Sequence, residues 1–125
     1  MKFNNSFCRL LPPLLWAGFL FYLSSVPSLQ SPFGVWDFYL RKLAHFTVYF
    51  ILAILIAPNF NKKSYAWLFS ALIASIYGVF DEFHQSFVPG RHMAFTDMLI
   101  NSSGAFLAGI VIKVRNNAAK VEESL

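Results

Sequence analysis

The sequence predicts an all-α membrane protein whose four helices cross the bilayer as one bundle. Of its 125 residues, 57% are hydrophobic, 18% are aromatic and only 13% are charged. A water-soluble domain of this size would expose too much apolar surface. The apolar residues fall into four long stretches, and a helix needs about 20 such residues to cross the hydrocarbon core. We therefore expect helices near residues 7–24, 38–57, 64–80 and 94–114, in a single domain covering 1–125.

The first apolar stretch is expected to be a membrane-spanning helix. Pro12 and Pro13 fall in its opening turns, where missing amide donors cost little, and the polar run Ser24–Pro27 ends it. A cleaved signal peptide is the alternative, because Lys2 and Arg9 precede the apolar run and small residues follow it. No convincing small-x-small cleavage site is present, so we favour the membrane helix.

The connections between the stretches contain residues that break helices. Pro27 and Pro32 predict an irregular loop between the first and second helices. The segment Pro58–Asn61 predicts a tight connection, so that the second and third helices are antiparallel neighbours. Pro89 and Gly90 suit the two central positions of a type II turn, which would reverse the chain between the third and fourth helices.

The fourth helix carries small residues four positions apart. Gly104 and Ala108 form one such pair, and Ala105 and Gly109 form another. Such spacing allows close helix–helix approach in membranes. The partner helix could belong to the same chain or to a second copy, and the same chain is favoured for so small a bundle. Residues 115–125 are polar, and we expect a solvated, frayed tail.

The charge distribution indicates membrane topology. The chain has ten Lys and Arg against six Asp and Glu, a net charge of +4. These cations form no basic stripe, which argues against nucleic-acid binding. The positive-inside rule instead predicts that both termini and the short second loop are cytoplasmic. The cations on that side are Lys2, Arg9, Lys62, Lys63, Lys113, Arg115 and Lys120. The single cysteine, Cys8, excludes an intrachain disulfide.

With this topology, polar groups from three helices reach one level near the extracytoplasmic face. In each of these helices the polar residues repeat at steps of three or four, which places them on one helical face. Ionisable residues are costly at membrane depth, so the cluster is a candidate functional site. The predicted ligand-binding residues are Lys42, His45, Asp81, Glu82, Gln85, Arg91, Asp97 and Asn101.

These residues leave several functions open. The cluster could serve only to lock the helices together. Glu82 and His45 are candidates for a general base in a membrane-embedded enzyme. No known zinc-site spacing is present, so we predict no metal and no cofactor. A small transporter is a further alternative, but the cytoplasmic halves of the helices offer almost no polar residues to line a path. Lys42 could simply extend to the interface.

The chain resembles the VanZ-like family of small bacterial membrane proteins over nearly its whole length. The shared segments are Phe21–Pro27, Lys42–Phe46 and Tyr77–Arg91, followed by Asp97, Asn101 and Gly104. They are similar to the family's Asp-Glu-x-x-Gln, Pro-Gly-Arg, Asp and Asn-x-x-Gly pattern. Two departures are Arg41, where the family often has an acidic residue, and His92–Ala94, where it has small residues.

The resemblance implies a multi-pass protein of the bacterial cytoplasmic membrane, with its polar motif on the extracytoplasmic side. The family is named for an accessory determinant of resistance to the lipoglycopeptide teicoplanin. We therefore expect a protein that alters susceptibility to such antibiotics through a polar pocket that binds an anionic lipid or a lipid-linked envelope precursor. The alternatives are an enzyme acting on such a precursor and a small transporter.

Overall fold

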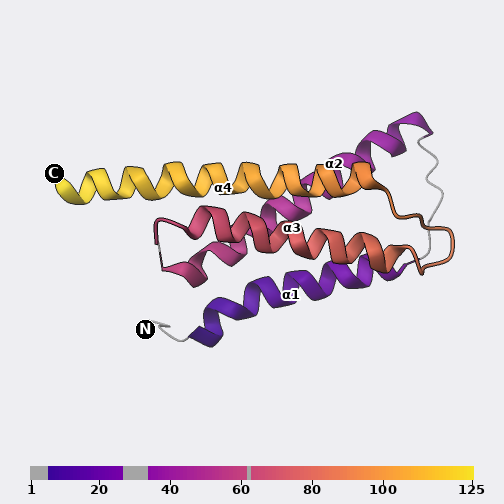
Figure 1. Cartoon of the computed structure of the whole chain (residues 1–125), viewed down its shortest axis with the longest axis horizontal. Coiled ribbons are helices and arrows are strands. Elements are labelled where there is room, and N and C mark those ends of the chain that lie inside the picture. The colour runs from indigo at the N-terminus through magenta and orange to yellow at the C-terminus, as the bar shows by residue number, and fades with distance from the viewer. Residues whose placement is uncertain (1–5, 27–33, 62) are drawn as a thin grey trace.

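The computed structural model describes residues 6–26, 34–61 and 63–125, and the described chain is almost entirely helical. Its elements are α1 (Ser6–Ser25), α2 (Val35–Ile56), the short 3-10 helix η1 (Ala57–Phe60), α3 (Ala66–Gln85) and α4 (Phe95–Ser124), shown in Figure 1. The four α-helices of the described part are each long and apolar enough to cross a membrane. The all-α fold class and the four membrane helices expected from the sequence are confirmed.

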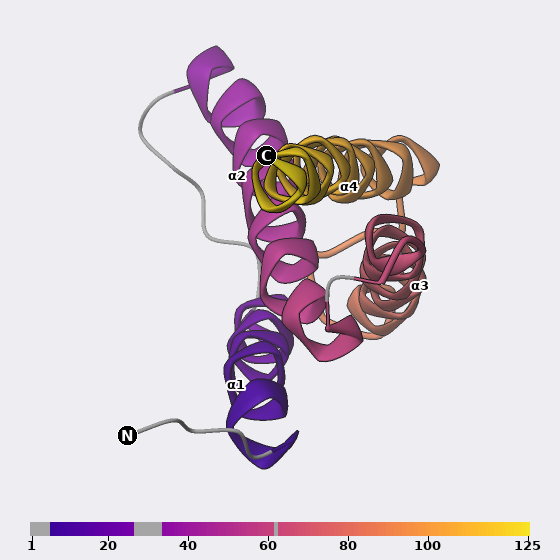
Figure 2. The ribbon, with the colours of Figure 1, turned by 90° about the vertical axis from the view of Figure 1, so that its left-hand side faces the viewer.

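The helix α2 is central to the packing of the bundle. It is strongly inclined to α4 and packs against each of the other three α-helices, while α3 lies alongside α4 (Figures 1 and 2). The helix α1 begins, and α4 ends, at the same end of the bundle (Figure 1). The core between the helices consists of Leu20, Tyr49, Leu52, Ala53, Ile56, Ala74, Ala105 and Ala108.

The small residues of α4 bring its backbone into contact with α2 and α3. A Cβ atom added to Gly104 would lie 2.2 Å from the carbonyl oxygen of Phe46, and one added to Gly109 would lie 2.9 Å from that of Trp67. Side chains at these positions would therefore displace the neighbouring backbone. Gly104 and Gly109 therefore pack against helices of the same chain, as expected from the sequence.

Some helix boundaries differ from those expected. The helix α2 begins at Val35 and α3 continues to Gln85. The expectation of a frayed tail after residue 114 was wrong, because α4 continues to Ser124. No Gly or Pro follows Gly109, and good helix formers such as Ala118 and Ala119 continue the hydrogen-bonding pattern. The predicted first loop, with Pro27 and Pro32, lies outside the described residues, as do Lys2 and Lys62.

Two prolines lie inside α1 and change how its first turns are held. Pro13 has no amide hydrogen, so the carbonyl of Arg9, four residues earlier, lacks its usual helical partner. The side chain of Asn59 supplies the missing donor, with its Nδ2 atom 3.0 Å from the Arg9 oxygen. The η1 segment therefore holds the start of α1. From the sequence we expected this segment only to connect the second and third helices.

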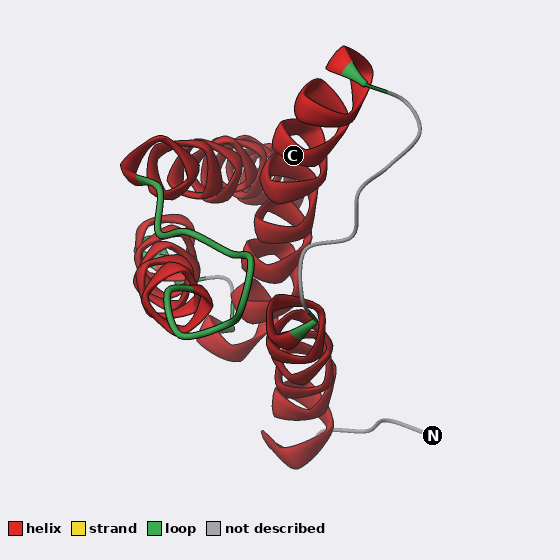
Figure 3. Cartoon of the chain, turned by 90° about the vertical axis from the view of Figure 1, so that its right-hand side faces the viewer, coloured by secondary structure: helices red, strands yellow, loops and turns green. Residues whose placement is uncertain are grey.

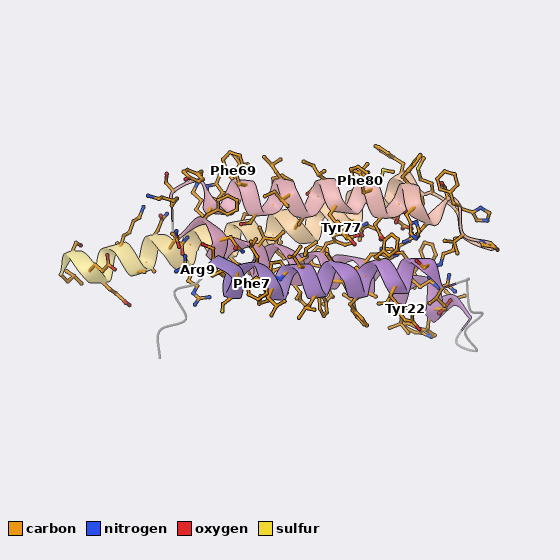
Figure 4. The ribbon with its side chains drawn as sticks, turned by 90° about the horizontal axis from the view of Figure 1, so that it is seen from below. Phe7, Arg9, Tyr22, Phe69, Tyr77 and Phe80 are labelled. Carbon is orange, nitrogen blue, oxygen red and sulfur yellow. The ribbon has the colours of Figure 1, made fainter. Side chains whose placement is uncertain are left out.

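The outer surface of the bundle is strongly apolar. Figure 4 shows Phe7, Tyr22, Phe69 and Phe80 on the outside of α1 and α3, and each is substantially exposed. Such side chains suit contact with lipid tails rather than water. Tyr77 instead lies between α3 and α1, and its hydroxyl donates a hydrogen bond of 2.5 Å to the carbonyl of Ala17 (Figure 4).

Candidate functional site

Most of the buried polar residues of the described chain lie at one end of the bundle, where α1 and α3 terminate and α2 and α4 begin. We call this the polar end, and Figure 3 shows it with the α3–α4 connection in green. Five polar side chains here are at most 5% exposed: Ser24, Asp81, Glu82, Gln85 and Asn101. Because buried polar groups are costly without partners, their hydrogen bonds determine how the helices meet.

The first group of contacts joins α1 to α3. The hydroxyl of Ser24 donates a hydrogen bond to Asp81 Oδ1. The amide of Gln85, one turn further along α3, donates to Asp81 Oδ2 at 3.2 Å. Asp81 thus accepts hydrogen bonds at both oxygens, from donors on two different helices.

The second group joins α2 to α4. The Lys42 ammonium forms an ion pair with Asp97, which lies in the first turn of α4. One turn deeper, His45 Nδ1 lies 3.1 Å from Asn101 Oδ1. Since that carbonyl oxygen can only accept, the imidazole donates through Nδ1.

Glu82 faces a different helix from its neighbour Asp81, as the 100° step of an α-helix predicts. It is fully buried, and its Oε2 atom accepts a hydrogen bond of 3.3 Å from the backbone amide of Ala94, the residue that precedes α4. Its Oε1 atom has no hydrogen-bond partner among the described residues. Glu82 therefore holds the start of α4 and presents one unpaired oxygen to the interior.

The structure brings together three possible metal ligands that the sequence spacing did not suggest. Ligand atoms of His45, Glu82 and Asp97, from three different helices, all lie within 4.8 Å of one another. Carboxylate and imidazole groups are common ligands of divalent cations. However, the ammonium of Lys42 already pairs with Asp97 and supplies a cation to this cluster.

A cavity of about 370 Å³ opens between α1, α2 and α3 beside these groups. Four of the predicted ligand-binding residues line it: His45, Asp81, Gln85 and Arg91. The other four, Lys42, Glu82, Asp97 and Asn101, lie on the α4 side and are not part of its wall. The wall also includes the apolar side chains of Leu20, Leu23, Val26, Ala44 and Val48.

Arg91 reaches the cavity from the turn between α3 and α4. The amide of Arg91 donates to the carbonyl of Val88 at 3.1 Å, and Gly90 has a φ of 78°, as expected of a type II turn. The guanidinium of Arg91 donates hydrogen bonds to the carbonyls of Val26 and Leu23, at 3.1 and 3.2 Å. Arg91 therefore satisfies backbone groups at the C-terminal end of α1, and two of its five donors are used in this way.

The cavity wall also includes Arg41 and Ser24, which were not among the predicted site residues. Arg41 lies on the wall and forms an ion pair of 3.0 Å with Asp37, one turn earlier in α2. Ser24 also lines the cavity. Both had a signal in the sequence, since Arg41 departs from the family pattern and Ser24 belongs to the shared Phe21–Pro27 segment.

The two remaining histidines, His84 and His92, do not line this cavity. The ring of His84 stacks on Phe21, with 4.3 Å between ring centroids, and contacts the hydroxyl of Ser25 at 2.9 Å. His92 is exposed in the connection before α4. His84 therefore adds a contact between α3 and α1 outside the cavity.

Comparison with known proteins identifies the family but gives no close relative. The family model described as VanZ/LLP1 matches residues 5–116, which is almost the whole chain. No curated protein and no solved structure matches it. The matched region contains α1, α2, α3, the part of α4 up to residue 116, and every residue of the polar end described above. The chain is therefore a membrane-helical member of the VanZ/LLP1 family.

Proposed function

We propose that the protein binds the anionic group of a lipid or of a lipid-linked envelope precursor in the polar-end cavity, and so alters susceptibility to teicoplanin-type lipoglycopeptides. In this proposal the polar end faces the extracytoplasmic side of the bacterial cytoplasmic membrane. Family membership supports the link to these antibiotics, and the positive-inside rule supports the orientation. Binding would sequester an envelope group from the antibiotic or from the enzymes that process it.

The observation that carries this proposal is the amphiphilic wall of the cavity. Arg41 and Arg91 supply two guanidinium groups, which suit phosphate and carboxylate oxygens. The carboxylate of Asp81 also lies on the wall, but its two oxygens accept hydrogen bonds from Ser24 and Gln85. The apolar side chains of α1 and α2 would contact the lipid part of the ligand. A ligand with a charged head and an apolar chain fits these surroundings.

The predicted residues on the α4 side have a supporting part in this proposal. Asn101 accepts the Nδ1 hydrogen of His45 and so fixes which imidazole nitrogen faces the remaining groups. The Lys42–Asp97 ion pair and the Glu82–Ala94 hydrogen bond hold the start of α4 against α2 and α3. These residues position the cavity wall, whereas His45, Gln85, Arg41 and Arg91 contact the ligand.

The proposal is tested by two variants that break the same ion pair. Arg41→Gln removes a cavity cation, whereas Asp37→Asn breaks the pair and leaves Arg41 in place. In a strain whose teicoplanin susceptibility depends on this protein, Arg41→Gln should abolish most of that effect and Asp37→Asn should retain it. Immunoblots of membranes would check that both variants are present at equal levels. Equal susceptibility of the Arg41→Gln and wild-type strains would refute the cavity's role.

A membrane-embedded enzyme acting on the same kind of precursor is the second candidate. It is favoured by the unpaired Oε1 atom of Glu82 in the cluster with His45, because His45 also lines the cavity. A carboxylate and an imidazole in such a desolvated place suit acid–base chemistry. Purified protein incubated with labelled envelope lipids should then form a new product, and Glu82→Gln should prevent its formation. Binding without turnover would favour the first candidate.

A further inference from the structure

A second cavity lies at the opposite end of the bundle, between the start of α1, η1 and the last turns of α4. Its volume is about 340 Å³. Figure 4 shows Arg9 at this end of α1, with Tyr22 at the other end. Its ten lining residues include Arg9, Asn61, Arg115 and Asn116. None of them belongs to the polar-end site.

The charges of this wall all have one sign. Arg9 and Arg115 contribute two guanidinium groups from helices at opposite ends of the sequence, and the ten lining residues include no Asp or Glu. Asn61 and Asn116 add two carboxamides, which can donate hydrogen bonds to an oxyanion. The polar-end cavity differs, because the carboxylate of Asp81 forms part of its wall. This second cavity is therefore the more selective of the two for anions.

The rest of the wall is apolar. Ile54, Val111 and Ile112 lie beside the polar groups, on the segments of α2 and α4 that belong to the membrane-spanning helices. A free phosphate ion would gain no binding free energy from this apolar surface. The glycerol backbone and first acyl carbons of a lipid would bury it and so stabilise the complex. The combination matches a headgroup bound at the membrane interface.

The cationic part of the cavity is positioned by hydrogen bonds rather than left to a flexible loop. The guanidinium of Arg9 donates to the side-chain oxygen of Asn61, the residue that follows η1 with a φ of 51°. The carbonyl of Arg9 accepts from Asn59 at 3.0 Å, and the same Asn59 amide donates to the carbonyl of Ile56 at 3.1 Å. These bonds fix Arg9 against η1 before any ligand arrives, which lowers the entropy lost on binding.

We infer that this cavity binds the phosphate headgroup of an anionic phospholipid from the leaflet at its own end of the bundle. Two guanidiniums can hold phosphate oxygens by charge-assisted, bidentate hydrogen bonds. Basic pockets between membrane helices are a known form of headgroup recognition. The inference is independent of the proposed function, since it concerns different residues at the other end of the molecule. In this inference Arg9 and Arg115 bind a headgroup in addition to setting the membrane topology.

The test measures lipid binding to the purified full chain in detergent, by native mass spectrometry during titration with phosphatidylglycerol or phosphatidylcholine. Phosphatidylglycerol should bind at least tenfold more tightly than phosphatidylcholine. Arg115→Gln, an exposed residue of α4, should remove most of that preference. Lys120→Gln removes the same charge from α4 outside the cavity wall, and it should change binding less than twofold. Equal effects of these two variants would show only general charge attraction and overturn the inference.

Two further arms separate the possible sources of the phosphate and the possible effects on folding. Excess glycerol phosphate should not displace phosphatidylglycerol, and displacement at millimolar concentration would overturn the lipid assignment. Arg9→Gln should also lose the preference, and circular dichroism would report whether the start of α1 stays folded. Lys63→Gln should retain the preference, because Lys63 is exposed before α3 and lines neither cavity. If Lys63→Gln lost the preference as Arg9→Gln does, general charge attraction would explain the binding and this inference would fail.

Discussion

The ammonium of Lys42 in α2 pairs with the carboxylate of Asp97 in the first turn of α4, 55 residues later in the chain. The two side chains are only 24% and 15% exposed, so solvent screens this pair less than it screens a surface ion pair. The pair also lies where the helix dipole of α4 is positive, which favours the carboxylate. It joins α2 to the start of α4 at the polar end.

A double-mutant cycle should detect this pairing. Lys42→Met and Asp97→Asn should each destabilise the protein, because each leaves the opposite charge without its partner. The double variant should be more stable than the sum of the two losses predicts, with a coupling energy of about 1–2 kcal/mol. Reversible unfolding in mixed micelles would measure it. Strict additivity would mean that the two charges do not interact.

The same lysine should control whether the cluster takes a metal ion. His45, Glu82 and Asp97 have ligand atoms within 4.8 Å of one another, and Lys42 supplies their cation. Lys42→Met should therefore bind Mn²⁺ or Zn²⁺ at least tenfold more tightly than the wild type does, because it leaves two carboxylates uncompensated. Calorimetric titration after chelation would check this. Adding Glu82→Gln should remove the gained affinity, and its persistence would contradict the prediction.

Two glycines offer a matched test of close helix packing. Gly104→Ala would place a Cβ atom 2.2 Å from the carbonyl oxygen of Phe46, so the backbones of α2 and α4 must separate. We expect a loss of about 2–3 kcal/mol in the free energy of unfolding. Gly18→Ala in α1 meets no atom within 4 Å and should cause no loss. Equal stability of the two variants would show that α4 does not approach α2 this closely.

The contact between Asn59 and the start of α1 should depend on Pro13. Asn59→Leu removes the donor to the Arg9 carbonyl and should cost about 1–2 kcal/mol. In a Pro13→Ala background, the new amide at position 13 can donate to that carbonyl, so Asn59→Leu should cost less. Thermal unfolding of the four proteins would give the comparison. An undiminished cost in the Pro13→Ala background would rule out this explanation of the contact.

The orientation in the membrane is testable with cysteines at the two ends of the bundle. His92 and Lys63 are exposed, and they lie in the connections after α3 and before it. In a chain with Cys8→Ser, a cysteine at 92 should react with an impermeant maleimide in intact cells. A cysteine at 63 should react only after lysis. Reaction of both in intact cells would contradict the four-pass topology.

Periodicity and composition were sufficient to predict the four helices, because long apolar runs have few alternatives in a membrane. The ends of the helices were harder to predict. The tail after residue 114 contains polar residues, which suggested fraying, yet its alanines and charged residues are good helix formers and nothing there ends α4. The start of α2 at Val35 was also missed, because the charged residue Asp37 interrupts the apolar residues there.

The candidate site was predicted as one group, and the structure divides it. The steps of three and four correctly placed Asp97 with Asn101 and Asp81 with Gln85 on shared faces. They could not show that α2 crosses the bundle at a steep angle, so that Lys42 meets α4 while Arg41 lines the cavity with α1. Which face of α2 meets which helix depends on packing between distant segments, and the pattern within one helix does not contain it.

The attachment of α1 has a consequence for how the protein comes apart. Only Pro13, Leu20 and Ser24 of this helix are buried, and its ties to the bundle include hydrogen bonds from Asn59, Tyr77 and Arg91 and others to Asp81 and Val48. Few buried side chains therefore hold α1 to the bundle, whereas α4 packs closely against α2 at Gly104 and against α3 at Gly109. In hydrogen–deuterium exchange, α1 should therefore detach as a separate unit of low stability while the other three helices remain assembled.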